Sequence, residues 1–145
     1  MLSYHSIFLF YFFFLLKIHF TFPQNARIVK LADFEENRSY LPIRKNDEFI
    51  LEVEGNPTTG YKWYLENAEI VAKNKILFPN NLDSNGSGVF FNSNKEKNLI
   101  NGIYHFQFIA KEQGNEKLVF SYYKDPKERI KKVVEVHVKD VKKDL

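Results

Sequence analysis

The stretch IYHFQFIA, residues Ile103–Ala110, places an aromatic or small apolar side chain at every second position. A period of two residues is that of a β-strand, because successive side chains of a strand point to opposite faces of a sheet. The side chains that would share the apolar face are Tyr104, Phe106, Phe108 and Ala110. The sequence therefore predicts a strand with one buried face.

The same alternation occurs on both sides of this stretch. The repeated sets are Leu118, Phe120 and Tyr122, then Val134, Val136 and Val138, and the short apolar run Phe49–Val53 precedes them. Turn-forming residues fill the intervals 80–88, 92–101 and 112–115. Six to eight short strands separated by turn signals indicate an antiparallel sandwich or barrel, and two packed sheets bury the apolar faces economically. The predicted fold class is all-β, an immunoglobulin-like antiparallel β-sandwich of about 7–8 strands.

One segment fits this pattern less clearly. Residues Ala68–Ile76, AEIVAKNKI, are compatible with a helical turn or with a strand, and the β-rich surroundings favour a strand. No segment carries a sustained helical period, and no internal repeat is visible.

Residues 1–26 are typical of a secretory signal peptide. The apolar run Ile7–Leu16 has the length of the hydrophobic region of such a signal and is shorter than the roughly 20 residues that span a bilayer. We expect cleavage between Thr21 and Arg27, which leaves one domain over residues 27–145; an uncleaved anchor is the alternative. The expected location is the secretory pathway, with the protein secreted or held in lysosome-like or vacuolar vesicles and free of the membrane after signal removal.

Two further features bear on this route. Asn37-Arg-Ser39 and Asn85-Gly-Ser87 are candidate N-glycosylation acceptors, at Asn37 and Asn85. The chain has no cysteine, although small secreted domains usually depend on disulfides. The hydrophobic core must therefore hold the fold alone, which a domain of about 119 residues can do by burying about 65% of its unfolded surface.

Composition excludes several functions. Without Lys17, the 21 basic residues of the chain become 20 against 18 acidic ones, so there is no electrostatic basis for nucleic-acid binding. Without cysteine there is no thiol nucleophile and no thiolate metal site. The domain has two histidines, His105 and His137, and both fall within predicted strands, where we expect them to face the solvent. Neither lies in a recognisable hydrolase motif, so we expect no enzyme activity, no cofactor and no metal.

The stretch NPTTGYKW, Asn56–Trp63, holds the only tryptophan of the chain. Pro57 restricts one φ angle, and Gly60 allows a turn that other residues resist. The β-branched Thr58 and Thr59 restrict their own rotamers, so little conformational entropy is left to lose on binding. The sequence thus predicts a stiff, blunt and uncharged loop, whose exit strand is anchored in the core by Tyr61 and Trp63.

This stretch resembles the signature loop of the chagasin family, small immunoglobulin-like β-sandwiches that inhibit papain-like cysteine proteases. The similarity extends over most of the mature chain, through Gly102–Phe106, Gly114 and Lys117–Tyr123. It implies that three loops at one end of the sandwich form a wedge in the active-site cleft, with the first loop near the catalytic cysteine. The residues implied to contact the protease are Asn56, Pro57, Thr58, Thr59, Gly60 and Tyr61, then Leu99, Ile100, Asn101 and Gly102, and then Tyr123, Lys124, Asp125 and Pro126.

The second and third loops depart from the family pattern. The second loop keeps one glycine, Gly102, where the family loop is glycine-rich. The third loop has Tyr123–Pro126 where the family usually has Arg-Pro-Trp, so Lys124 would stand for the arginine and Tyr123 would supply an aromatic contact. The resemblance implies a monomeric, reversible, competitive inhibitor of a cathepsin-type protease, either endogenous or from a host. The residues alone leave open a non-inhibitory immunoglobulin-like adhesion module and a hydrolase or sugar-binding sandwich.

Overall fold

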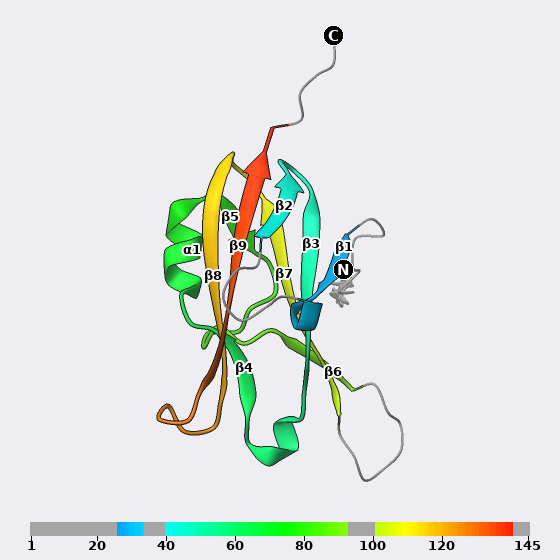
Figure 1. The fold of residues 1–145 in the computed structure, drawn as a ribbon, viewed down its shortest axis with the longest axis vertical. Helices are drawn as coiled ribbons and strands as arrows, with labels where there is room; N and C mark the ends of the chain where they lie inside the picture. The colour runs from blue at the N-terminus through cyan, green and yellow to red at the C-terminus, as the bar shows by residue number, and fades with distance from the viewer. Residues whose placement is uncertain (1–25, 34–39, 93–100, 141–145) are drawn as a thin grey trace, which may run out of the picture.

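The computed structural model describes residues 26–33, 40–92 and 101–140. Within them the chain forms nine strands, one α-helix and two 3-10 turns (Figure 1). In chain order they are β1 (Arg27–Lys30), η1 (Leu31–Asp33), β2 (Tyr40–Arg44), β3 (Glu48–Gly55), η2 (Pro57–Thr59), β4 (Lys62–Leu65), α1 (Ala68–Asn74), β5 (Leu77–Pro79), β6 (Val89–Asn92), β7 (Gly102–Ala110), β8 (Gly114–Tyr123) and β9 (Ile130–Lys139). The predicted signal peptide, Asn37, Leu99 and Ile100 lie outside the described residues, apart from Ala26. No helix in the described part of the chain is long and apolar enough to cross a membrane.

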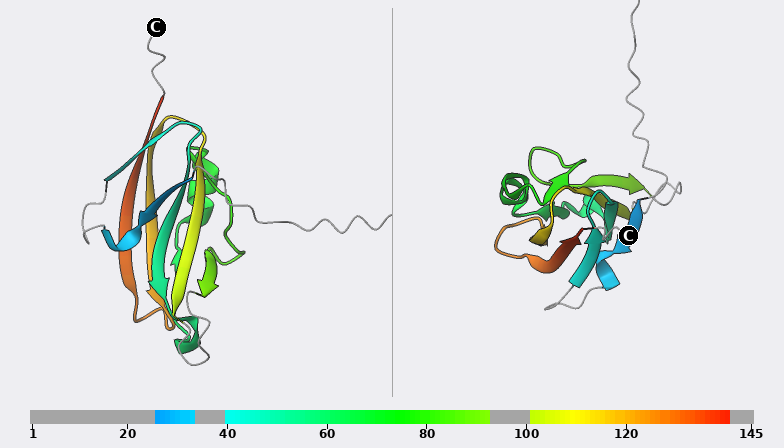
Figure 2. Two further views of the ribbon diagram at one scale, coloured as in Figure 1. Left: turned by 90° about the vertical axis from the view of Figure 1, so that its right-hand side faces the viewer. Right: turned by 90° about the horizontal axis from the view of Figure 1, so that it is seen from above.

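The strands form two sheets that face each other, which confirms the predicted sandwich (Figure 2). The first sheet has the order β1-β3-β7, and both β5 and β6 pair with the free edge of β7. The second sheet has the order β2-β9-β8-β4.

The pairing is not antiparallel throughout. β1 pairs with β3, and β2 pairs with β9, in parallel register. Parallel neighbours require a long connection rather than a tight hairpin. In both cases the intervening chain contributes a strand to the opposite sheet. Both sheets are therefore mixed, and the prediction of an antiparallel sandwich was wrong for these two pairs.

The core confirms the alternation that the sequence showed. Tyr104, Phe106, Phe108 and Ala110 are all buried on the inner face of β7. Phe108 stacks on Phe49 of the neighbouring strand, with 5.3 Å between ring centroids. Phe106 reaches across to Phe120 of the opposite sheet in an edge-to-face contact of 4.9 Å, so aromatic packing joins the two layers.

The segment predicted to be a strand at 68–76 is instead the helix α1. It connects β4 of one sheet to β5 of the other and buries a single side chain, Val71, among its own residues. Lys75 ends it in a left-handed conformation, with φ 62°. Because seven residues make barely two turns and bury one position, the sequence carries almost no helical periodicity there.

Candidate functional site

The strand registers bring three connections to one end of the sandwich, at the bottom of Figure 1. Gly55 at the end of β3 pairs with Gly102 at the start of β7, and Lys62 at the start of β4 pairs with Tyr123 at the end of β8. The first loop (residues 56–61), Asn101 of the second loop and the third loop (residues 124–129) therefore lie together. Of the fourteen residues predicted to contact a protease, twelve gather here, and the other two, Leu99 and Ile100, lie outside the described residues.

The first loop is held by its own side chains. The Oδ1 atom of Asn56 accepts hydrogen bonds from the backbone N–H of Thr58 at 3.0 Å and from its hydroxyl at 2.5 Å. The carbonyl of Asn56 accepts a bond from the hydroxyl of Thr59 at 2.7 Å, and the N–H of Gly60 donates to the carbonyl of Pro57 at 3.0 Å. Asn56 thus acts as the N-cap of a single 3-10 turn whose exposed tip is uncharged. Gly60 has φ +84°, a left-handed conformation, which confirms the prediction of a turn there that other residues resist.

The base of the first loop is anchored in the core. Trp63 is only 6% exposed, and its indole N–H donates to the carbonyl of Glu54 at 3.0 Å, which joins the two ends of the loop. Its ring stacks on Tyr122, with 5.0 Å between centroids, and Tyr61 packs on the same ring at 5.4 Å. Trp63 is buried as predicted, whereas Tyr61 is half-buried at the edge of the core.

The end of the second loop contacts the start of the first loop. The Nδ2 group of Asn56 donates to Oδ1 of Asn101 at 3.2 Å. The neighbouring Gly102 is buried, and a Cβ atom there would lie 2.2 Å from the carbonyl oxygen of Phe91. Only glycine lets β6 approach β7 so closely, so the one glycine kept in this loop has a packing role.

The third loop leans on the first. A Cβ atom on Gly60 would lie 3.0 Å from Cδ and 3.4 Å from Nζ of Lys124, so the stem of this lysine runs across the glycine. The hydroxyl of Tyr61 lies 3.5 Å from a carboxylate oxygen of Glu128. Lys124, which the resemblance matched to an arginine, therefore supports the first loop and also places a cation beside its tip.

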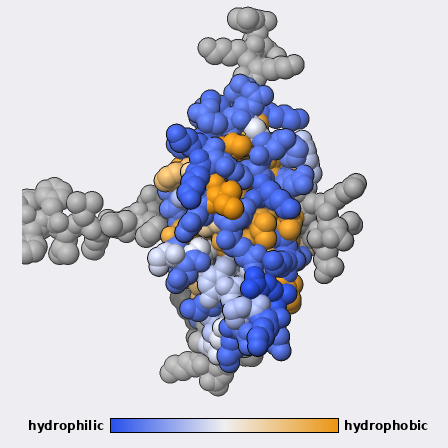
Figure 3. Space-filling model, turned by 90° about the vertical axis from the view of Figure 1, so that its left-hand side faces the viewer, coloured by the Kyte–Doolittle hydropathy of each residue, from blue (hydrophilic) through white to orange (hydrophobic). Residues whose placement is uncertain are grey.

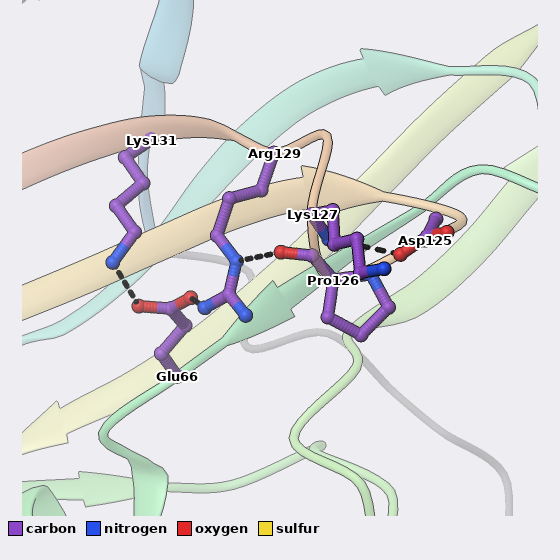
Figure 4. A network of polar contacts seen from close by, with 6 residues as sticks. All are labelled: Glu66, Asp125, Pro126, Lys127, Arg129 and Lys131. Atoms are coloured by element: carbon purple, nitrogen blue, oxygen red, sulfur yellow. Dashed lines mark hydrogen bonds and ion pairs between the residues drawn. The ribbon is translucent and has the colours of Figure 1, made fainter.

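A network of charged residues holds the third loop to the second sheet (Figure 4). Arg129 donates to the carbonyl of Pro126 at 2.8 Å and to the carboxylate of Glu66 at 2.5 Å. The other oxygen of Glu66 lies 3.1 Å from the ammonium group of Lys131. Burial acts to raise the pKa of Glu66, but the hydrogen bonds from Lys131 and Arg129 outweigh it and lower that pKa below its ordinary value.

Sequence reasoning did not find Glu66 or Arg129. The two residues are 63 positions apart, and neither belongs to the motif that suggested the site. Tyr123, which was predicted, points to the outer face of the second sheet, where its ring packs on Tyr64 at 4.8 Å and beneath the Arg129 guanidinium at 5.3 Å.

The surface of the loop end is polar rather than hydrophobic. On the face shown in Figure 3, hydrophobic colours gather at mid-height, and the loop end at the bottom is pale to hydrophilic. The tip residues Thr58, Thr59 and Gly60 are exposed, as are Lys124, Asp125 and Pro126. The site is therefore a neutral tip beside a loop of mixed charge.

Both histidines lie within strands, His105 in β7 and His137 in β9. Both were predicted to face the solvent; each does lie on an outer sheet face, but the side chain of His105 is only 15% exposed and that of His137 24%. His105 contacts Glu52 at 2.8 Å, and burial lowers its pKa although Glu52 partly offsets this effect. Among the described residues, no three histidine, cysteine or acidic side chains are grouped so that they could hold a metal ion.

Comparison with known families agrees with this geometry. The family model described as chagasin family peptidase inhibitor I42 matches residues 42–138, which include all three loops. The chain belongs to the chagasin family. No match was found among curated protein sequences.

Two solved structures support the fold of this chagasin-family chain. The solution structure of amebosin has 18% identity and a TM-score of 0.56, and the alignment covers 79% of this chain and 98% of amebosin. The crystal structure of the inhibitor EhICP2 from Entamoeba histolytica has 14% identity and a TM-score of 0.53, with 79% of this chain and 96% of that protein covered.

Proposed function

We propose that this chain is a reversible, competitive inhibitor of papain-like cysteine proteases that inserts its loop end into the active-site cleft. The family is one of peptidase inhibitors, and the related EhICP2 is described as a cysteine protease inhibitor. The observation that carries the proposal is the first loop, a hydrogen-bonded and uncharged turn that projects from an anchored base. The target is an endogenous or a host protease.

In this proposal the loops have different roles. The tip residues Thr58, Thr59 and Gly60 fill the centre of the cleft near the catalytic cysteine. The hydrogen bonds of Asn56 already fix this tip, so binding requires little further ordering, and the same bonds disfavour a cleavable, extended conformation. Tyr123 supports the third loop from below, and Lys124, Asp125 and Pro126 contact the protease beside the cleft.

The experiment is a titration of papain and of a cathepsin L-like enzyme with the mature protein, followed with a fluorogenic peptide. We expect stoichiometric, reversible inhibition that excess substrate relieves, and no effect on trypsin. Full activity of both cysteine proteases at an excess of the protein would overturn the proposal. Incubation of the protein alone with the same substrate tests the accompanying expectation that it has no catalytic activity of its own.

A non-inhibitory adhesion module, the alternative that the residues left open, is not favoured, because the family match is to peptidase inhibitors. The expectation of a monomer stays a prediction, which size-exclusion chromatography with light scattering would check.

We also propose that the protein follows the secretory route, with residues 1–26 removed. The support is the apolar N-terminal segment and the acceptor Asn85, which is exposed in a turn. The Ser87 hydroxyl of that acceptor is buried and donates to the carbonyl of Trp63 at 3.0 Å, so a glycan would have to be added before this turn folds. N-terminal sequencing of the native protein and a mobility shift after glycosidase treatment test the two claims; a first residue of Met1 would refute processing.

A further inference from the structure

We infer that Glu66, in the turn between β4 and α1, is a positioning residue of the inhibitory site, which holds the third loop in its binding shape through Arg129. The inference rests on the proposed function, since it assigns a role within the same site. Glu66 belongs to none of the three loops, and the family motif does not point to it.

The backbone around Glu66 is a fixed anchor. Its N–H donates to the carbonyl of Val119 in β8 at 2.8 Å. The next side chain, Asn67, donates to the carbonyl of Lys117 at 2.6 Å and accepts the N–H of Val119 at 3.0 Å. The turn is therefore tied to the central part of β8, away from the loop end, and the carboxylate projects from a rigid support.

Both oxygens of that carboxylate are used. One accepts from Arg129 at 2.5 Å and the other from Lys131 at 3.1 Å, while the side chain of Glu66 is 21% exposed (Figure 4). Charge-assisted bonds of this kind are stronger than neutral ones, and two cations that converge on one carboxylate form a network rather than an isolated surface pair. The carboxylate thus fixes the direction of the Arg129 side chain.

Arg129 in turn fixes the loop that it ends. Its Nε group donates to the carbonyl of Pro126, in the middle of the loop, and its guanidinium lies over the ring of Tyr123, immediately before the loop. The Arg129 side chain therefore contacts the residue that precedes this six-residue connection and a residue in its middle, and Arg129 is itself the last residue of the connection. Within the loop, Asp125 accepts the N–H groups of Lys127 at 2.9 Å and of Glu128 at 3.0 Å, which completes a closed turn.

The shape of this loop decides how the first loop is supported. Lys124 runs across Gly60 only while the third loop leans towards the first. If Glu66 is removed, Arg129 loses its fixed partner and the third loop can sample other arrangements. Ordering it again on binding then reduces the affinity for the protease.

Acid does not release this arrangement. The pKa of Glu66 lies below its ordinary value of 4.5, so the carboxylate remains charged at pH 5, and the charged groups that face it are the guanidinium of Arg129 and the ammonium of Lys131. The positioning contact is therefore present under the mildly acidic conditions in which cathepsin-type enzymes are commonly assayed.

The test compares inhibition of papain at pH 5 by Glu66→Ala, Arg129→Ala and the double variant. Glu69→Ala, which removes an exposed acid three residues away in α1, is the matched control. We expect Glu66→Ala and Arg129→Ala each to raise the inhibition constant about fivefold. The inhibition constant of the double variant should not exceed the higher of the two single-variant values, and that of Glu69→Ala should equal the wild-type value. This non-additivity separates positioning through Arg129 from a general structural effect, and equal melting temperatures of Glu66→Ala and Glu69→Ala verify that the fold is kept.

A second readout does not depend on inhibition. The loop contains three trypsin sites, after Lys124, Lys127 and Arg129, and mass spectrometry would follow the rate of cleavage after Lys127 in the free protein. We expect this cleavage to be faster in Glu66→Ala than in Glu69→Ala, because the loop must open to enter trypsin. An unchanged inhibition constant in Glu66→Ala, or additive effects in the double variant, would overturn the inference. The proposed function would still stand in that case, because it depends only on inhibition by the wild type. If the wild type does not inhibit papain, the proposed function fails, and the cleavage rate alone decides whether Glu66 holds the loop.

Discussion

Replacing Gly60 by alanine tests whether the shape of the first loop determines inhibition. Gly60 has φ +84°, a conformation that disfavours an L-amino acid by about 1–2 kcal/mol. The added Cβ would also lie 3.0 Å from Cδ and 3.1 Å from Cε of Lys124. Those atoms belong to the far part of a mobile stem and can move aside, so the backbone strain is the larger effect.

This strain energy must lower either the free energy of unfolding of the free protein or the affinity for the protease. If the loop keeps its shape, the free energy of unfolding falls by about 1–2 kcal/mol, which lowers the melting temperature of a domain of this size by about 5 °C. If the loop relaxes, that energy is required again when the protease restores the shape, and the tip meets the cleft with an extra methyl group. For a central contact we expect a loss of about 2 kcal/mol, which is a rise of about 30-fold in the inhibition constant.

The assay is the inhibition constant of Gly60→Ala against papain, measured with its melting temperature. Gly114→Ala is the matched control, because Gly114 also has positive φ, +151°, and a Cβ there would lie 2.9 Å from Ile76, but it begins β8 at the opposite end from the loops. We expect Gly114→Ala to lose stability and to inhibit like the wild type. An inhibition constant of Gly60→Ala within about threefold of the wild type, together with an unchanged melting temperature, would refute the reasoning, since the strain of about 1–2 kcal/mol would then appear neither in binding nor in stability. A larger loss of affinity for papain in Lys124→Ala than in Gly60→Ala would show that the third loop contributes more to binding than the first loop does.

Three other predictions concern the same molecule. Asn56→Ala removes the cap of the 3-10 turn and should lower the free energy of unfolding by about 1 kcal/mol, with weaker inhibition of papain; unchanged inhibition would mean that the cap does not shape the tip. Tyr123→Ala removes a ring that packs on the outer sheet face, so calorimetry should show a lower melting temperature together with weaker inhibition, whereas Lys124→Ala should weaken inhibition by at most about 1 kcal/mol at unchanged stability. Because burial lowers the folded-state pKa of His105 below 6.5, its contribution to stability is complete above about pH 6.5 and is lost as the pH falls through the lowered pKa. Urea unfolding between pH 7 and 5 should show this decline, and His105→Gln should flatten it; an equal decline in both proteins would assign it to other groups.

The sequence by itself determined the features that local chemistry controls. Alternating apolar residues such as Phe106 and Phe108 form strands because a pleated chain turns every second side chain towards the core, and the structure buries both. The left-handed turn at Gly60 follows from the same kind of local reasoning, since few residues other than glycine adopt positive φ without strain. The motif around it also indicated the family.

Tertiary structure alone decided what depends on distant partners. The parallel pairing of β1 with β3 and of β2 with β9 reflects which sheet each connection reaches, and no local pattern encodes that choice. The helix α1 escaped detection because its single buried residue, Val71, depends on the two sheets that it joins. Glu66 and Arg129 meet across 63 positions, since the β4–α1 turn and the β8–β9 connection are brought together only when the second sheet forms. A carboxylate and a guanidinium on a surface can each pair with many partners, so it is the folded geometry that selects this pair.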